Sequence, residues 1–217
     1  MFQDRAEAGR RLGDRLLAFK DRHPVVLALP RGGVPIGYEI ARVLEAPLDL
    51  ILVRKIGAPG QEELAIGAIA DGEHPELVTD PTLIAGLDVT PEYLEQAKAA
   101  ALREIERRRR AWLGHRPPVE IAGCTAIIVD DGIATGATIK VALRATRRRK
   151  PARLVLAVPV APPHVVEELW LDADEVVCLE MPKDFFAVGQ FYRRFLQLRD
   201  EEVTRLLERA QTDGRFP

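Results

Sequence analysis

Two adjacent acids followed by a loop of small residues stand near the middle of the chain. The run from Thr125 to Val129 is short, apolar and rich in β-branched residues, which predicts a buried parallel strand, and Asp130 and Asp131 leave its carboxyl end. The loop that follows contains small and hydroxylic residues: Gly132, Ala134, Thr135, Gly136, Ala137 and Thr138. Such a loop lets main-chain amides approach an anion closely, and the two threonines add hydroxyl donors. We therefore expect a phosphate at the amino end of a helix that begins near Gly136.

The two acids indicate that the ligand has a second, hydroxyl-bearing part. Two carboxylates that both faced a phosphate would repel it. Because an ionised carboxylate only accepts hydrogen bonds, its natural partners are vicinal sugar hydroxyls, and a ribose 5-phosphate would suit the acids and the loop together. The alternative is an ordinary strand-to-helix turn with a capped helix. A nucleotide P-loop is not expected, because no Gly-Lys-Ser/Thr follows.

The segment from Val129 to Thr138 resembles the phosphoribosyl pyrophosphate (PRPP) motif of type I phosphoribosyltransferases, which has apolar residues, two acids and Thr-Gly-x-Thr. The resemblance implies an α/β fold with a doubly wound, mostly parallel sheet. It also implies transfer of a phosphoribosyl group to a nitrogenous, purine-like acceptor, with Mg2+ bound alongside PRPP and Asp130 and Asp131 as its candidate ligands through water. A homo-oligomer, a dimer, is expected from the same resemblance. Two alternatives stay open: a PRPP- or nucleotide-sensing regulator with RNA as a candidate partner, and a ribose-phosphate hydrolase or phosphatase.

A second loop resembles another part of the same family. Pro30-Arg31-Gly32-Gly33 follows a predicted strand and is similar to the family's pyrophosphate loop. On that resemblance, Arg31 neutralises pyrophosphate and the amides of Gly32 and Gly33 donate to it. Members of the family often hold a non-proline cis peptide here, so we predict one between Pro30 and Arg31. The alternative is a glycine turn that caps the next helix, with Arg31 merely solvated.

A further basic residue is expected beside this loop. Lys55 resembles the residue that the family directs at pyrophosphate, and Arg54 is the alternative, because adjacent side chains of a strand point to opposite faces. The segment 56–64 contains Gly57, Pro59 and Gly60, and we expect it either to fold over a bound substrate or to be an idle surface loop.

The stretch 179–189 resembles the base-binding segment of hypoxanthine-type purine enzymes. On that match, Phe186 stacks on a planar acceptor and Val188 lines its pocket. The alternative is that the aromatic residues of this region belong to the core or to an interface. One departure bears on the acceptor: Ala134 stands where hypoxanthine-type enzymes carry an aspartate. The identity of the acceptor and of any general base is therefore left open.

The composition bounds the remaining possibilities. A chain of 217 residues can bury one sizeable core, and a formal charge of −2 gives no general attraction to nucleic acid or membrane. No apolar run approaches the roughly 20 residues of a spanning helix, and the start of the chain has no apolar signal region, so we expect a cytoplasmic protein. Cys124 and Cys178 are expected to be buried thiols rather than metal ligands. The basic runs 107–110 and 147–150 are expected to be solvated helix faces, with nucleic-acid contact as the alternative.

The pattern of the chain predicts alternating strands and helices around these loops. Strands are expected at 25–29, 48–53, 125–129, 154–160 and 175–179, and helices at 3–20, 34–44, 136–149 and 164–170. We expect a single domain over 1–217, with a C-terminal hood at 178–199 and an insertion at 54–123. The insertion is expected to contain a hairpin of 63–70 with 76–79 and a long helix, 91–113, capped by Thr90. The carboxyl ends of the parallel strands would then gather the polar loops at one edge of the sheet.

Overall fold

A parallel sheet forms the centre of the molecule. The computed structural model describes residues 1–71 and 75–212, and in those residues five parallel strands form a sheet of order β2-β1-β6-β7-β8. The strands are β1 (Pro24–Ala28), β2 (Leu48–Leu50), β6 (Thr125–Val129), β7 (Arg153–Val160) and β8 (Glu175–Glu180). The register of the central pair places Val26 opposite Ile127. The expected mixed α/β fold with a parallel sheet is confirmed.

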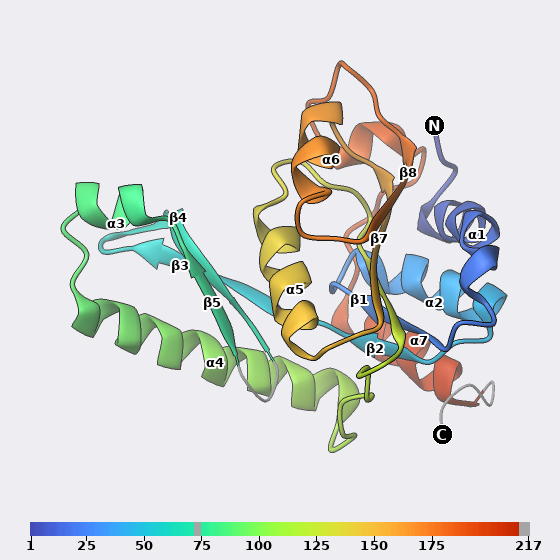
Figure 1. Cartoon of the computed structure of the whole chain (residues 1–217), viewed down its shortest axis with the longest axis horizontal. Coiled ribbons are helices and arrows are strands. Elements are labelled where there is room, and N and C mark those ends of the chain that lie inside the picture. Colours follow the sequence, from blue (N-terminus) through green and yellow to red (C-terminus); the bar gives the residue numbers. More distant parts are fainter. Residues whose placement is uncertain (72–74, 213–217) are drawn as a thin grey trace.

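Helices cover both faces of this sheet (Figure 1). The helices α1 (Arg5–Arg15), α2 (Gly33–Leu44) and α7 (Asp200–Thr212) lie on one face, and α5 (Ala137–Arg148) and α6 (Pro163–Leu169) on the other. Consecutive residues of a strand therefore enter two different cores: Val26 packs on the α2 side and Leu27 on the α5 side. Two short 3₁₀ turns lie at Leu17–Phe19 and Val188–Phe191. The sequence-based prediction contained the other helices of this sheet but missed α7.

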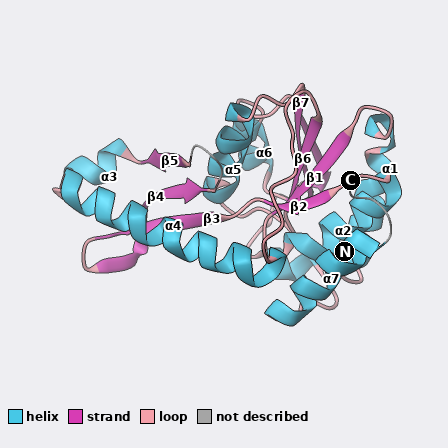
Figure 2. Ribbon diagram, turned by 90° about the horizontal axis from the view of Figure 1, so that it is seen from below, coloured by secondary structure: helices cyan, strands magenta, loops and turns pink. Residues whose placement is uncertain are grey.

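The segment after β2 forms a lobe of its own (Figures 1 and 2). The strands β3 (Val53–Ala58), β4 (Gln61–Ala70) and β5 (Glu76–Thr79) form an antiparallel sheet, followed by α3 (Pro81–Gly86) and the long α4 (Pro91–Leu113). The hairpin of β4 with β5 was expected, and so was the cap of α4, where Thr90 Oγ1 accepts a hydrogen bond from the amide of Tyr93 at 3.2 Å.

One expectation about this lobe is wrong. The segment 56–64, expected to be a loop over the substrate or on the surface, instead forms most of the paired β3-β4 hairpin, with Gly60 in its turn at φ 70°. The physical reason is tertiary packing. Ile56 and Ala58 are buried with Ile66 of β4 in a small core of the lobe, and this burial favours a strand despite the local glycines and proline.

A buried network of ions fastens α4 and the chain after it to the edge of the main sheet. Asp49 of β2 is completely buried, and its carboxylate accepts hydrogen bonds from Arg116 at 3.2 Å, from Arg109 at 3.4 Å and from the amide of Val119 at 2.8 Å. Arg109 also donates to Asp71 at 2.8 Å. Burial raises the pKa of Asp71, and the Arg109 guanidinium opposes that shift. Asp49 of β2 thus binds both α4 and the segment that follows it.

No helix in the described ranges is long and apolar enough to cross a membrane.

The Asp49 network predicts a large effect of one substitution on stability. We expect Asp49→Asn to lower the free energy of unfolding by about 2–4 kcal/mol, because it removes the buried negative charge that the Arg109 and Arg116 guanidinium groups both contact. Urea unfolding followed by circular dichroism measures the change. The matched control is Asp172→Asn, which breaks the more exposed pair with Arg144 and should cost less than about 1 kcal/mol. Equal losses in the two variants would contradict the role given to the network.

Candidate functional site

The loops after β1 and β6 lie side by side at the carboxyl edge of the sheet. β1 and β6 are neighbours, but the chain leaves β1 for α2 on one face and leaves β6 for α5 on the other. Open α/β sheets bind their ligands at such a divergence, and we call the region between the two loops the crevice. A cavity lies there, lined by Leu29 and Pro30 from one loop and by Asp130 and Thr138 from the other. The peptide between Pro30 and Arg31 is cis, as predicted.

The two glycines after β1 allow these loops to approach each other closely. A Cβ atom at Gly32 would overlap the carboxylate of Asp131, and one at Gly33 would overlap the carbonyl oxygen of Val129. The amide of Gly33 donates to the carbonyl of Leu29 at 2.9 Å, whereas no hydrogen bond of the described residues is donated by the amide of Gly32. Only one of the two glycine amides is therefore available to a ligand in this conformation.

Asp130 and Asp131 have different surroundings although they are consecutive. Asp130 lines a cavity of about 120 Å³, and its Oδ1 accepts a hydrogen bond from the amide of Asp131 at 2.8 Å. Asp131 accepts a hydrogen bond at Oδ2 from Nε of Arg5, at 2.8 Å. Its main-chain carbonyl accepts another from the hydroxyl of Tyr192, at 2.6 Å. One acid is thus open to a cavity and the other is held by the protein.

Burial disfavours the ionised form of both acids. Burial raises the pKa of Asp130 well above its usual value, and the neighbouring Asp131 charge raises it further. Burial also raises the pKa of Asp131, but there the Arg5 guanidinium opposes the shift. The pKa of Tyr192 is raised as well, first by burial and then by the charge of Asp131. Perturbed acids in a crevice are typical of functional sites.

The loop after the acids presents amides at the start of α5. Gly136 precedes this helix with φ 75°, a conformation that other residues rarely adopt. No hydrogen bond of the described residues is donated by the main-chain amides from Thr135 to Ile139. The loop is held against the sheet, because Ile133 is buried and its amide donates a hydrogen bond to the carbonyl of Val160 in β7 at 3.0 Å. The result is a fixed set of donors at the positive end of a helix.

Of the two basic residues considered at the start of β3, Arg54 rather than Lys55 lines the cavity beside Asp130. The walls of that cavity come from the ends of β1, β2 and β6, the start of β3 and one face of α4: Leu29, Pro30, Ile51, Leu52, Val53, Arg54, Glu104, Ile105, Arg108, Trp112, Asp130 and Thr138. Lys55 is exposed and does not line it. Since Arg54 shares its strand face with the buried Ile56, it points toward α4, and its Nη1 lies 3.8 Å from Glu104 Oε1.

Glu104 of α4 lies at the wall of this cavity and binds guanidinium groups. It accepts hydrogen bonds from Arg107 at 2.8 and 2.9 Å and from Arg108 at 2.8 Å, and these two arginines lower its pKa to about 2. Glu104 is therefore an anion at every physiological pH. The basic run 107–110 is largely paired within the chain, because Arg109 binds Asp71 and Arg110 donates to Glu106 at 2.6 Å. Arg107, Arg108 and Arg110 are exposed, as expected for a solvated helix face, whereas Arg109 is sheltered.

Arg31 lies against the C-terminal part of the chain. Its Nη1 donates to the carbonyl of Leu198 at 2.8 Å and lies 3.7 Å from Asp200 Oδ1. The side chain is exposed, so the guanidinium stands at the rim of the crevice rather than inside it.

The segment after β8 closes another side of the crevice. Val188 packs against Gly132, where a Cβ atom would meet its side chain at 2.6 Å. Phe186 is 90 % exposed, whereas Phe185, Phe191 and Phe195 pack against the core. Gln190 holds the loop in place by accepting hydrogen bonds from the amides of Phe186 and Ala187, at 3.0 and 3.1 Å. Of these phenylalanines, only Phe186 is free to meet a ligand.

Several residues of the site were not found from the sequence. Arg5, Tyr192, Glu104 and Arg108 reach the crevice only through the fold. Arg5 belongs to the arginine-rich helix predicted at 3–20, and 126 positions separate it from Asp131. No local pattern could have identified it. Cys124 and Cys178 are free and partly buried, and burial raises the pKa of Cys178 to about 11.

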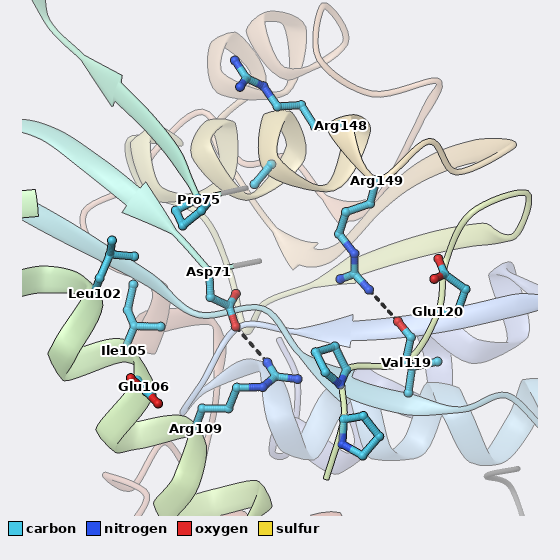
Figure 3. A pocket seen from close by; sticks show the side chains of 13 residues that line it. Asp71, Pro75, Leu102, Ile105, Glu106, Arg109, Val119, Glu120, Arg148 and Arg149 are labelled. Atoms are coloured by element: carbon cyan, nitrogen blue, oxygen red, sulfur yellow. Dashed lines mark hydrogen bonds and ion pairs between the residues drawn. The ribbon is translucent and has the colours of Figure 1, made fainter. Parts of the chain in front are cut away.

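A larger cavity, of about 670 Å³, lies away from these loops (Figure 3). Its walls come from the middle of α4, the residues 117–120 and the end of α5, and no residue of the two loops lines it. Its polar groups bind one another: Arg109 donates to Asp71 at 2.8 Å and Arg149 to the carbonyl of Val119 at 2.5 Å. Its size alone therefore does not make it the functional site. In the described residues, no group of three or more His, Cys, Asp or Glu side chains is placed to hold a metal ion.

Comparisons with known proteins point to one family. The model of the phosphoribosyl transferase domain matches residues 4–195. Proteins of two Mycobacterium tuberculosis strains, named "Putative phosphoribosyl transferase MT0597" and "Putative phosphoribosyl transferase Rv0571c", are each 45 % identical over 213 residues, which is 98 % of this chain and 48 % of the relative. The chain thus spans about half the length of these curated relatives. The crystal structure of TT1426 from Thermus thermophilus matches with a TM-score of 0.80 and 42 % identity, covering 97 % of this chain and 99 % of that one.

Because Asp130 is buried and forms no ion pair with another described residue, we expect its charge to reduce the stability of the fold. An acid whose pKa is raised on folding destabilises the fold at a pH above its unfolded pKa, and this cost is absent below that pH. We expect Asp130→Asn to raise the melting temperature at pH 7 by about 2–4 °C, equivalent to about 1 kcal/mol. At pH 3.5 the gain should disappear. Differential scanning calorimetry at both pH values measures it.

The neighbouring acid supplies the comparison. Asp131→Asn should melt below Asp130→Asn at pH 7, because it takes the anion away from Arg5. If Asp130→Asn melts below the wild type at pH 7, the assignment of Asp130 as the uncompensated acid is wrong.

Proposed function

Since this chain belongs to the phosphoribosyl transferase family, we propose that it transfers the 5-phosphoribosyl group of PRPP to a nitrogenous acceptor and releases pyrophosphate. The observation that carries the proposal is the crevice between the β1 and β6 loops. There, main-chain amides with no acceptor among the described residues begin a helix next to a carboxylate that lines a cavity. An anion and a hydroxyl-bearing ring a few ångströms apart match these two features.

The 5-phosphate is assigned to the loop of Gly132, Ala134, Thr135, Gly136, Ala137 and Thr138. Its oxygens accept hydrogen bonds from the amides between Thr135 and Thr138 and from the threonine hydroxyls. Each charge-assisted bond contributes about 1.5–3 kcal/mol. The buried Ile133 holds the loop rigid, so that few of these contacts are lost to loop motion.

The ribose is assigned to the two acids. Their carboxylates accept hydrogen bonds from its vicinal hydroxyls. When the bond from C1 to the pyrophosphate oxygen breaks, positive charge develops on the ring, and the acceptor nitrogen forms the new bond to C1. A fixed negative charge beside the ring stabilises that state more than the ground state, which is how electrostatics accelerates a reaction. Asp130, which lines the cavity, is the nearer of the two acids in this assignment.

The pyrophosphate is assigned to the loop after β1 and the cations beside it. The amide of Gly32 donates to it, and Arg31 and Arg54 neutralise its charge from two sides; Lys55, on the other face of β3, remains a candidate for the same role. The side-by-side oxygens of Asp130 and Asp131 fit Mg2+, which binds one or two carboxylates together with phosphate oxygens and keeps several waters. When bound with PRPP, Mg2+ supplies further neutralisation of the leaving group.

The acceptor is assigned to the segment after β8. Phe186 offers an exposed ring for stacking, and Val188 lines the side of the pocket that faces Gly132. With Ala134 in the loop, no acid is available at the position where hypoxanthine-type enzymes have one. We propose a planar nitrogen heterocycle, purines among them, that needs no general base from this loop. We keep the insertion 54–123 and the hood 178–199 as parts of one domain, and a homo-oligomer in the cytoplasm as the working assembly.

The alternative is a PRPP- or nucleotide-sensing regulator of the same fold. The missing acid at Ala134 favours it, because a sensor needs the PRPP site but no chemistry at the acceptor. RNA binding gains no support, since Arg107, Arg108, Arg110 and Arg147 all have carboxylate partners within the chain.

Binding of PRPP tests the assigned roles directly. We expect wild-type protein to bind PRPP with Mg2+, and the double variant Asp130→Asn with Asp131→Asn to bind at least about 100-fold more weakly, since each acid accepts charge-assisted bonds. Calorimetric titration measures both, with Asp172→Asn as the control for a sheltered, paired acid outside the two loops. Equal affinity in the wild type and the double variant would disprove the roles given to the acids.

Turnover separates the enzyme from the sensor. With PRPP, Mg2+ and a panel of purines, pyrimidines and other nitrogen heterocycles, we expect one acceptor to yield a nucleotide and pyrophosphate, detected by chromatography and by exchange of labelled pyrophosphate. Binding without exchange for every acceptor would favour the sensor. Release of ribose phosphate without an acceptor would favour a hydrolase.

A further inference from the structure

We propose that Glu104 is a stand-in anion: in the free protein its carboxylate binds Arg54 and Arg108, the two arginines that bind the pyrophosphate group when the ligand is present. This inference rests on the proposed function. It adds to the pyrophosphate site a second cation from the lobe, Arg108, and an acid of the chain that competes for the same arginines. All three side chains line the cavity beside Asp130. They come from β3 and α4, outside the two loops of the crevice.

One oxygen of Glu104 is the acceptor that the two arginines share. Its Oε1 accepts a hydrogen bond from Nε of Arg108 at 2.8 Å and lies 3.8 Å from Nη1 of Arg54. Among the described residues, no other carboxylate lies within ion-pair distance of either arginine. Arg54 is 45 % exposed and Arg108 is 48 % exposed. Both guanidinium groups can therefore turn toward a ligand without leaving a buried position.

A third arginine keeps Glu104 paired when the other two bind a ligand. Arg107 donates two hydrogen bonds to the same carboxylate, from Nε to Oε2 at 2.8 Å and from Nη2 to Oε1 at 2.9 Å. Arg107 does not line the cavity beside Asp130. Paired bonds between a guanidinium and a carboxylate are strong and fix the orientation of both groups. Glu104 is thus still neutralised after Arg54 and Arg108 have turned to another anion.

The charges at this wall suit an anion that carries more than one negative charge. Glu104 offers one carboxylate to three guanidinium groups, so positive charge is in excess. Arg107 and Arg108 lower the pKa of Glu104 to about 2, so its own charge is constant at neutral pH. Pyrophosphate presents several charged oxygens, and planar guanidinium groups bind such oxygens as oriented pairs. It can therefore displace the carboxylate from Arg54 and Arg108.

An acid in this position limits how tightly the released product is held. Pyrophosphate must displace the hydrogen bond between Arg108 and Glu104 when it binds, and the same bond forms again when it leaves. Tight binding that is equal for every state of the reaction does not accelerate it. Glu104 contacts no reacting atom in this assignment, so it is a positioning residue that acts through Arg54 and Arg108.

Four variants separate the role of Glu104 from a general effect of charge. Glu104→Gln removes the competing charge and keeps the length of the side chain. Glu106→Gln is the matched control, because Glu106 lies on the same helix and pairs with Arg110 at 2.6 Å but does not line the cavity beside Asp130. Arg108→Met removes one proposed partner of the anion. The double variant, Glu104→Gln with Arg108→Met, completes a thermodynamic cycle.

The probe is inorganic pyrophosphate, titrated by calorimetry at neutral pH with a chelator present, so that only groups of the protein bind it. We expect Glu104→Gln to bind pyrophosphate about 5–10-fold more tightly than the wild type, because exposed ion pairs no longer compete with the ligand. Glu106→Gln should bind as the wild type does. Arg108→Met should bind more weakly, and adding Glu104→Gln to it should recover less than the gain seen in the wild-type background.

Fluorescence shows where the anion binds. Of the two tryptophans in the chain, Trp112 lines the same cavity as Glu104, whereas Trp170 follows α6 and is 48 % exposed. In a Trp170→Phe background, we expect pyrophosphate to change the emission of Trp112 with the Kd that calorimetry gives.

The outcomes distinguish this inference from the proposed function. If Glu104→Gln binds pyrophosphate as the wild type does, or more weakly, or if neither protein binds it, Glu104 does not compete with the anion and the inference is wrong. Equal gains in Glu104→Gln and Glu106→Gln, or binding without a change in Trp112 emission, would overturn it as well. If Glu104→Gln binds more tightly but no acceptor yields a nucleotide from PRPP, the proposed transfer fails and the competition at the anion site stands.

Discussion

Asp130 and Asp131 bring two carboxylates together at the carboxyl edge of the sheet, where burial disfavours a charge on either of them. The arrangement persists because the surrounding loops are built around it. Gly32 leaves room for the Asp131 carboxylate, the amide of Asp131 donates to Asp130, and Arg5 supplies the counter-charge. Burying the pair lowers the stability of the fold. The same burial places the two acids in a crevice from which water can be displaced, as functional sites commonly require.

The rest of the molecule supports this crevice from two sides. On one side, the buried Asp49 fastens α4 to the edge of the sheet, and α4 in turn presents Glu104 and Arg108 to the cavity that Asp130 lines. On the other side, the first residues of the chain pair with residues 191–194 and bring Arg5 and Tyr192 to Asp131. Neither of these supporting segments is adjacent in sequence to the motif from Val129 to Thr138. Both act through contacts between distant parts of the chain.

The membership of the phosphoribosyl transferase family and the geometry of the site carry different weight. The family match and the 42 % identical Thermus thermophilus structure establish the fold and the general class. They do not identify an acceptor, and the residues that surround the expected acceptor position, Ala134 and Phe186 among them, leave the choice of base open. The proposed chemistry therefore depends on the crevice itself, with its amides, acids and arginines.

The sequence by itself determined the features that depend on local order. The alternation of apolar strands and helices predicted the parallel sheet, because hydrophobic periodicity is a property of neighbouring residues. The motif from Val129 to Thr138 located the two acids and the loop to which we assign a phosphate, and the resemblance of Pro30 to Gly33 to a known loop predicted the cis peptide that the structure contains. The cap of α4 by Thr90 was readable in the same way.

Tertiary structure alone decided the rest. The segment 56–64 became a hairpin because Ile56 and Ala58 are buried under residues that follow later in the chain, and Arg54 rather than Lys55 reached the cavity because of the strand face that this burial fixed. Arg5 met Asp131 because the start of the chain pairs with residues near its end. The physical reason is common to all three cases: a side chain's partner across the fold depends on long-range packing, which leaves no signal in the residues adjacent to it.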